Sequence, residues 1–129
     1  MQNSFSRTEL LIGSEAMQKL TASSIAVFGI GGVGSFAAES LARSGIGKLS
    51  LFDADTISIS NINRQLIALN STVGKLKVQV LKERILDINP SCVVSLYACF
   101  YSESNAADYD LSDFDYIIDA MDTISSKLA

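Results

Sequence analysis

A glycine-rich turn between a predicted strand and a predicted helix constrains this fold more than any other feature. Residues 25–28 form the short apolar run that is typical of a buried parallel strand. The turn that follows has the spacing G-x-G-x-x-G, and a segment that favours a helix begins at Ser35. Such a turn lets backbone approach a phosphate, and the helix N-terminus attracts the anion. The sequence therefore predicts a nucleotide phosphate site, rather than a purely structural turn, at Gly29, Gly31, Gly32 and Gly34.

Strands and helices alternate along the rest of the chain. After the first strand, we expect strands at residues 48–52, 93–97 and 116–119. We expect helices at residues 7–20 with a break near Gly13, from 35 to a cap at Gly45, at 74–87, briefly at 106–111, and from about 123. This alternation predicts an α/β fold, in which a Rossmann-like parallel sheet with flanking helices stops after about four strands.

The chain is predicted to form a single domain. It has 129 residues, 48% of them hydrophobic, without a visible repeat or linker, so we expect one nucleotide-binding domain over residues 1–129. A sheet that ended near residue 119 would leave its last strand poorly covered. We therefore expect the domain to be the N-terminal part of a larger fold.

Composition excludes several classes of protein. No apolar run approaches the ~20 residues of a membrane span, and residues 1–4 lack the features of a signal peptide. The net charge of −4 gives no general case for nucleic-acid binding, and without histidine the chain itself cannot form a histidine-based triad. Cys92 and Cys99 show no pairing pattern, which favours a reducing, cytoplasmic location, and we expect both to be core residues.

Polar residues follow the second and fourth predicted strands. After the second strand come Asp53, Asp55, Asn61, Asn63, Arg64, Gln65 and Lys77. A carboxylate at position 53 can accept hydrogen bonds from a ribose, and arginine and lysine suit a triphosphate. Asp119 and Asp122 end the fourth strand, where a carboxylate could hold Mg²⁺. This set favours nucleotide triphosphate chemistry over the hydride transfer of a nicotinamide dehydrogenase, although each asparagine alone could shape a turn and Lys77 alone could be solvated.

An ordered set of motifs resembles the ThiF/MoeB/HesA family of adenylating enzymes, which are related to ubiquitin-activating enzymes. The motifs are GIGGVGS at 29–35, DAD at 53–55, NINRQ at 61–65, GKLK at 74–77 and DAMD at 119–122. Within that family, residues 5–13, 43–47, 62–69 and 84–90 are most similar to the tRNA threonylcarbamoyladenosine dehydratase branch. Family members run to about twice this length, which agrees with the expectation of a larger fold.

The resemblance implies roles for individual residues. It implies ATP on the glycine loop with Asp53 on the ribose, phosphate contacts from Arg64 and Lys77, and Mg²⁺ on Asp122. It implies that Arg7 reaches the phosphates of a partner subunit, so that the protein would be a homodimer. The catalytic residues would then be Arg64, Lys77 and Arg7. The other residues expected around the nucleotide are Asp55, Asn61, Asn63 and Gln65.

The implied activity is ATP-dependent adenylation of a carboxylate. In the dehydratase branch, ATP activates the threonyl carboxylate of a modified adenosine in tRNA, and loss of the activated oxygen closes a ring. One alternative is activation of the C-terminus of a ubiquitin-like sulfur carrier, for which a C-x-x-C pair in further sequence would be evidence. Another is a nucleotide-binding module without activity, which would show no ATP–pyrophosphate exchange.

Overall fold

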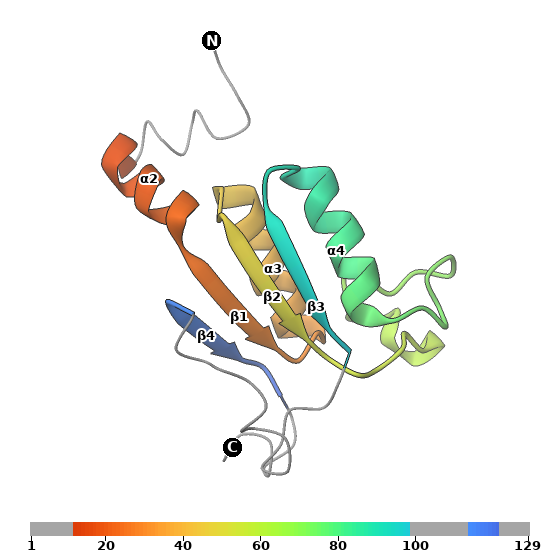
Figure 1. The fold of residues 1–129 in the computed structure, drawn as a ribbon. Coiled ribbons are helices and arrows are strands. Elements are labelled where there is room, and N and C mark those ends of the chain that lie inside the picture. Colours follow the sequence, from red (N-terminus) through yellow and green to blue (C-terminus); the bar gives the residue numbers. More distant parts are fainter. Residues whose placement is uncertain (1–11, 99–113, 122–129) are drawn as a thin grey trace.

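The sheet in the computed structural model is parallel throughout and contains the four predicted strands (Figure 1). The structure describes residues 12–98 and 114–121. The strands are β1 (Ser24–Phe28), β2 (Lys48–Phe52), β3 (Val93–Tyr97) and β4 (Tyr116–Asp119). The helices are α2 (Ser14–Ala22), α3 (Gly32–Ser44), α4 (Lys77–Ile88) and the short 3-10 helix η1 (Ile59–Asn61). The strand order β3-β2-β1-β4 confirms the predicted Rossmann-like fold.

The strands end together at one edge of the sheet. Phe28 of β1 lies level with Phe52 of β2 and with Asp119 of β4, and Phe52 lies level with Tyr97 of β3. Helices α3 and α4 both begin at this carboxyl edge and run back along the sheet (Figure 1). Open α/β sheets bind their ligands at this edge, so the topology brings the predicted polar residues to the expected place.

One face of the sheet carries the main hydrophobic core, beneath α3 and α4. Side chains alternate between faces along each strand, so every second strand residue contributes to this core. Its buried members include Ile25, Val27, Leu49, Leu51, Ala38, Ala42, Val78, Leu81 and Ile85. On the other face, the ring of Phe52 stacks between those of Phe28 and Tyr97, with centroid distances of 4.3 Å to each.

The helix boundaries differ from the predictions where glycines bend the chain. Gly13 has φ +87°, so α2 begins at Ser14, and the earlier part of the predicted helix lies mostly outside the described residues. The expected left-handed cap of α3 is confirmed at Gly45, which has φ +100°. Helix α4 begins only at Lys77, because Gly74 has φ +90° and the chain there pairs with an earlier segment.

Cys92 lies in the core, as predicted, with 4% of its surface exposed. Burial raises the pKa of its thiol, against a smaller lowering effect of a backbone hydrogen bond at Leu49. Cys99 and the helices expected at residues 106–111 and from about 123 lie outside the described residues. In the part of the chain that the structure describes, no helix is long and apolar enough to span a membrane.

Candidate functional site

The glycine loop joins β1 to α3 in a turn that excludes side chains at two positions. Gly29 has φ +92°, and a Cβ there would lie 2.7 Å from the carbonyl oxygen of Ala120. A Cβ on Gly34 would lie 1.8 Å from the carbonyl oxygen of Gly29. Both distances are far below contact distance, so the protein's own packing requires glycine at both positions.

Gly31 and Gly32 differ from these glycines, because the described chain leaves space in front of both. A Cβ on Gly31 would meet only Nε2 of Gln65, at 3.7 Å, and a Cβ on Gly32 would meet only the carbonyl oxygen of Arg64, at 3.5 Å. These are ordinary van der Waals distances. Packing within the described residues therefore does not explain glycine at these positions, whereas a ligand that approaches the backbone would explain it.

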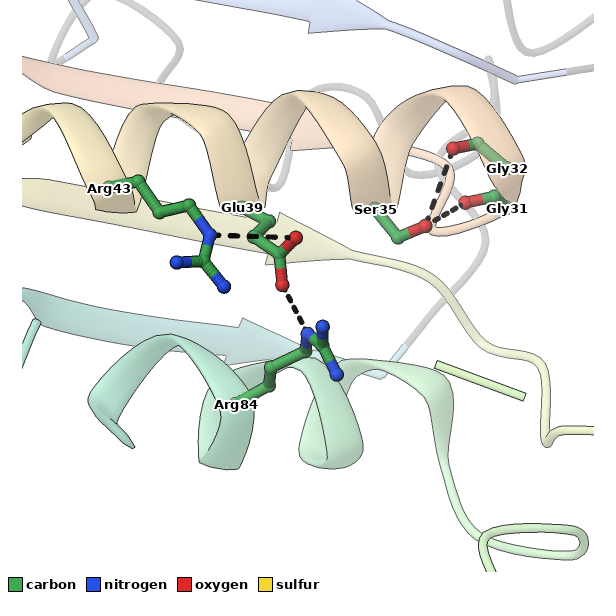
Figure 2. Close-up of polar contacts among 6 residues, drawn as sticks. All are labelled: Gly31, Gly32, Ser35, Glu39, Arg43 and Arg84. Atoms are coloured by element: carbon green, nitrogen blue, oxygen red, sulfur yellow. Dashed lines mark hydrogen bonds and ion pairs between the residues drawn. The ribbon is translucent and has the colours of Figure 1, made fainter. Parts of the chain in front are cut away.

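The first turn of α3 is suited to an anion. Its N-cap residue is Gly31, which has no side chain to cap the helix, and the turn contains no acidic residue. The Ser35 hydroxyl donates to the carbonyl oxygen of Gly31 at 2.5 Å and lies 3.4 Å from that of Gly32 (Figure 2). Because Ser35 binds carbonyl oxygens, it fixes the turn without occupying the N–H groups that point out of the helix.

Asp53, at the end of β2, is bound to the glycine loop. Its Oδ2 accepts a hydrogen bond from the Ile30 N–H at 2.6 Å, and its Oδ1 accepts one from the Asp55 N–H at 2.7 Å. A carboxylate has about four acceptor sites, so both oxygens can still accept from a ribose. Asp53 is thus a structural link in the site as well as a candidate ribose ligand.

A short antiparallel pairing places Lys77 near the same edge. The Ile57 N–H donates to the carbonyl oxygen of Lys75 at 2.9 Å, and the Lys77 N–H donates to that of Asp55 at 3.1 Å. The Lys77 residue is only 7% exposed, which argues against a solvated surface lysine. Its ammonium group has no ion pair or hydrogen bond within the described residues. A lysine with a mostly buried side chain and no acidic partner for its ammonium group is a candidate ligand for an anionic group.

Asn61 has a structural role that the sequence left open. It is 8% exposed, and its Oδ1 accepts a hydrogen bond from the Ser58 N–H at 2.9 Å. Its carbonyl oxygen accepts from the N–H groups of Arg64 and Gln65 at 3.2 and 2.9 Å. Asn61 therefore builds the turn that holds these two residues beside the glycine loop.

Arg64 and Gln65 lie beside the glycine loop but differ in exposure. Arg64 is exposed, and its Nη1 donates to the carbonyl oxygen of Ser60 at 2.9 Å and to Oδ1 of Asn63 at 3.0 Å. Gln65 is 9% exposed, and its buried Oε1 has no hydrogen-bond partner among the described residues. A buried acceptor is costly when unpaired, so a donor from a ligand would stabilise it.

The structure brings some of the predicted residues together and leaves others untested. The side chain of Gln65 and the backbone of Arg64 lie beside Gly31 and Gly32, and Asp53 and Lys77 lie at the same edge of the sheet. Arg7 and Asp122 lie outside the described residues, so the predicted arginine contact and magnesium ligand stay predictions. Among the described residues, no cluster of three or more His, Cys, Asp or Glu could hold a metal ion.

An ion-pair cluster behind the site was not predicted. Glu39 of α3 is 9% exposed and pairs with Arg84 of α4, and its Oε2 lies 3.7 Å from Nε of Arg43 (Figure 2). The sequence contains one weak signal for it: Glu39 follows the buried Ala38 and lies one turn after Ser35. The partner on α4 is 45 residues away, so only the fold could identify it.

Known proteins with similar sequences and folds cover nearly all of this chain. A tRNA threonylcarbamoyladenosine dehydratase of Bacillus subtilis is 52% identical over 128 residues, which cover 99% of this chain and 50% of that protein. The solved structure of the Escherichia coli tRNA N6-threonylcarbamoyladenosine dehydratase in complex with ATP is 44% identical, with a TM-score of 0.93, and covers 96% of this chain and 51% of that chain. A probable molybdopterin-synthase adenylyltransferase of Gracilaria tenuistipitata var. liui is 37% identical, over 90% of this chain and 32% of that protein.

These findings agree with the resemblance seen in the sequence. The chain spans about half the length of these two bacterial dehydratases. The ThiF family model matches residues 5–129, which is nearly the whole chain. On this evidence, the chain belongs to the ThiF family.

Proposed function

We propose that this chain is the nucleotide-binding part of an ATP-dependent tRNA threonylcarbamoyladenosine dehydratase. The observation that carries the proposal is the open backbone at Gly31 and Gly32, with Nε2 of Gln65, a hydrogen-bond donor, facing Gly31. The likeness to dehydratases, one of them solved with ATP, supports the choice of activity. In this proposal residues 1–129 are the N-terminal domain of a longer enzyme.

The phosphates of ATP would lie against the glycine loop and the first turn of α3. Backbone N–H groups would bind the phosphate oxygens, and Asp53 would accept from the ribose while holding the loop in place. Lys77 and Arg64 would contact the phosphates from the other side. Asp55, Asn63 and Gln65 would complete the nucleotide site. Asn61 would act through the turn that it builds.

Adenylation makes a carboxylate oxygen a good leaving group. The substrate carboxylate attacks the α-phosphorus, the bond to the β-phosphate oxygen breaks, and pyrophosphate leaves. A nucleophile within the same modified adenosine then attacks the acyl carbon, and AMP leaves with the original carboxylate oxygen. The cations of Lys77 and Arg64 would stabilise the negative charge that develops on the phosphates during attack.

A magnesium ion would neutralise part of the triphosphate charge. The residue proposed to hold it is Asp122, whose carboxylate is the kind of hard oxygen ligand that Mg²⁺ prefers. Asp119 is near in sequence, and its Oδ1 already accepts the N–H of Met121 at 3.1 Å. Asp119 is therefore a turn-forming residue in this structure.

The proposed assembly is a homodimer, in the cytoplasm, with modified tRNA as the substrate. Its support is the outer edge of the sheet, where β4 pairs with β1 and exposes 74% of Tyr116 and 43% of Ile117. A further strand or a second copy would cover these side chains. Arg7 of one copy would then reach the phosphates of the other.

Activation of a ubiquitin-like sulfur carrier remains the second candidate, because an adenylyltransferase of another pathway is also similar to this chain. Two measurements on the intact protein test the proposal: the first compares it with a nicotinamide dehydrogenase, and the second compares it with carrier activation. Calorimetry should detect tighter binding of ATP with Mg²⁺ than of NAD, and the reverse order would favour a nicotinamide dehydrogenase. ATP–pyrophosphate exchange should then require tRNA that carries threonylcarbamoyladenosine. Exchange with a carrier protein alone would support the second candidate, and no exchange with either would indicate a binding module.

A further inference from the structure

Behind the site, the carboxylate of Glu39 connects α3 to α4 in addition to the apolar packing of the two helices. Glu39 lies one turn after Ser35 on α3, and Arg84 lies two turns after Lys77 on α4. Figure 2 shows the two side chains meeting between the helices, while Ser35 on the same face of α3 points to the carbonyl oxygens of Gly31 and Gly32. The contacts of Ser35 with the glycine loop and the contact of Glu39 with α4 are therefore made one helical turn apart on the same helix.

The two arginines around Glu39 differ in what they connect. Arg84 reaches across from α4, and its side chain is 38% exposed. Arg43 lies on α3 itself, four residues from Glu39, and its side chain is 59% exposed. The Glu39 side chain is only 12% exposed, so its charge needs a cation nearby. Of these two ion pairs, only the one with Arg84 connects α3 to α4.

We propose that Glu39 and Arg84 are positioning residues for the nucleotide. Their pair sets the spacing between the glycine loop, at the start of α3, and Lys77, at the start of α4. The affinity for a triphosphate that contacts the N-termini of both helices should depend on this spacing. The affinity for adenosine, which contacts neither N-terminus, should not. This inference rests on the proposed function, because it takes ATP as the ligand of the site.

The test compares variants that remove each arginine but keep an unbranched apolar stem. Arg84→Met in the intact protein should weaken binding of ATP with Mg²⁺ about tenfold, a coupling typical of residues in one network, and leave adenosine binding unchanged. Arg43→Met is the matched control, since it removes a cation from the same carboxylate without separating the helices. It should bind ATP as the wild type does. Arg84→Lys should recover part of the affinity.

A second comparison separates positioning from general stability. If Arg84 acts by placing Lys77, then Arg84→Met should have little further effect on ATP binding in a Lys77→Ala background. The inference would be overturned if Arg84→Met weakened ATP binding equally in the wild-type and Lys77→Ala backgrounds. It would also be overturned if Arg84→Met and Arg43→Met weakened ATP binding equally. If Arg84→Met does not fold, Glu39→Gln takes its place in the same comparisons. A wild-type protein that binds no ATP would instead refute the proposed function, and the inference with it.

Discussion

The carboxylate of Asp53 accepts a hydrogen bond from the backbone N–H of Ile30, with 2.6 Å between Oδ2 and N. Ile30 is completely buried within the glycine loop, and Asp53 comes directly after β2. One side chain therefore fixes the loop to the neighbouring strand. The residue proposed to bind the ribose also sets the shape of the surface proposed to bind the phosphates.

Asp53→Asn should reduce both stability and nucleotide binding. The amide has only one acceptor oxygen, so one of the N–H groups of Ile30 and Asp55 would lose its acceptor and face an NH₂ group. We expect a loss of about 1–3 kcal/mol in the free energy of unfolding, measured by urea denaturation, and weaker ATP binding by calorimetry. Asp55→Asn is the stability control, because the Asp55 side chain is exposed and holds no loop. Equal losses in the free energy of unfolding of the two variants would contradict the structural role assigned to the Asp53 carboxylate.

The glycines should separate into those required by packing and those required by a ligand. Gly34→Ala would press a Cβ against the carbonyl oxygen of Gly29, so we expect a loss of about 2 kcal/mol or more in the free energy of unfolding. The Cβ added by Gly31→Ala has space within the described chain, so the stability of this variant should stay near that of the wild type. Its ATP binding should fall, because the Cβ would stand where the phosphates approach the backbone. Calorimetry and thermal unfolding of the two variants test this. A Gly31→Ala protein that binds ATP normally would show that no ligand approaches this backbone.

Much of this fold follows from local sequence, whereas several site contacts do not. The strands were predicted close to their observed positions because each is a short, mostly apolar run. The start of α4 was predicted too early, because residues 74–76 pair with a segment almost twenty residues before them. No local rule shows that the Asp53 carboxylate faces the Ile30 amide, or that Glu39 meets Arg84. Such contacts depend on how the strands and helices are placed together.

Stability should fall with rising pH through the titration of Cys92. Burial raises the pKa of this thiol above its value in the unfolded chain, so the folded protein holds the proton more tightly. The stabilisation is complete below the unfolded pKa and is lost as the pH rises through the folded pKa. Urea denaturation between about pH 7 and pH 10 measures this effect in the wild type and in Cys92→Ala. The free energy of unfolding should decline more steeply with pH in the wild type. Parallel curves would contradict this role of Cys92.

Arg64→Ala should weaken ATP binding as well as lower the rate. Its guanidinium is exposed, contacts the carbonyl oxygen of Ser60 and Oδ1 of Asn63, and is held by the turn that Asn61 builds. Since both contacts of this guanidinium are exposed to solvent, their loss should leave thermal unfolding nearly unchanged. Asn61→Ala should instead lower stability and ATP binding together, because it removes the acceptor for Ser58. If Arg64→Ala left both ATP affinity and rate unchanged, this arginine would not contact the phosphates.

Lys77→Ala should lower adenylation at least ~10²-fold, the loss typical of one electrostatic contact in a transition state, and leave the fold intact. The Lys77 residue is 7% exposed and its ammonium has no ion pair within residues 12–98 and 114–121, so no bond in the described protein is lost on substitution. Its position at the first residue of α4 is fixed by its backbone N–H on the carbonyl oxygen of Asp55. That bond survives the change to alanine, so the backbone that places residue 77 remains.

Lys75→Ala is the matched control for Lys77→Ala, because it removes the same charge two residues away from an exposed side chain. The carbonyl oxygen of Lys75 accepts the N–H of Ile57, and that backbone contact is also kept in the variant. ATP–pyrophosphate exchange by the intact enzyme measures both variants, with thermal unfolding as the test of fold. Lys75→Ala should retain nearly full exchange. Similar losses in the two variants would show that only the local positive charge matters and that Lys77 is wrongly assigned. No loss in either would remove the electrostatic basis proposed for adenylation at this site.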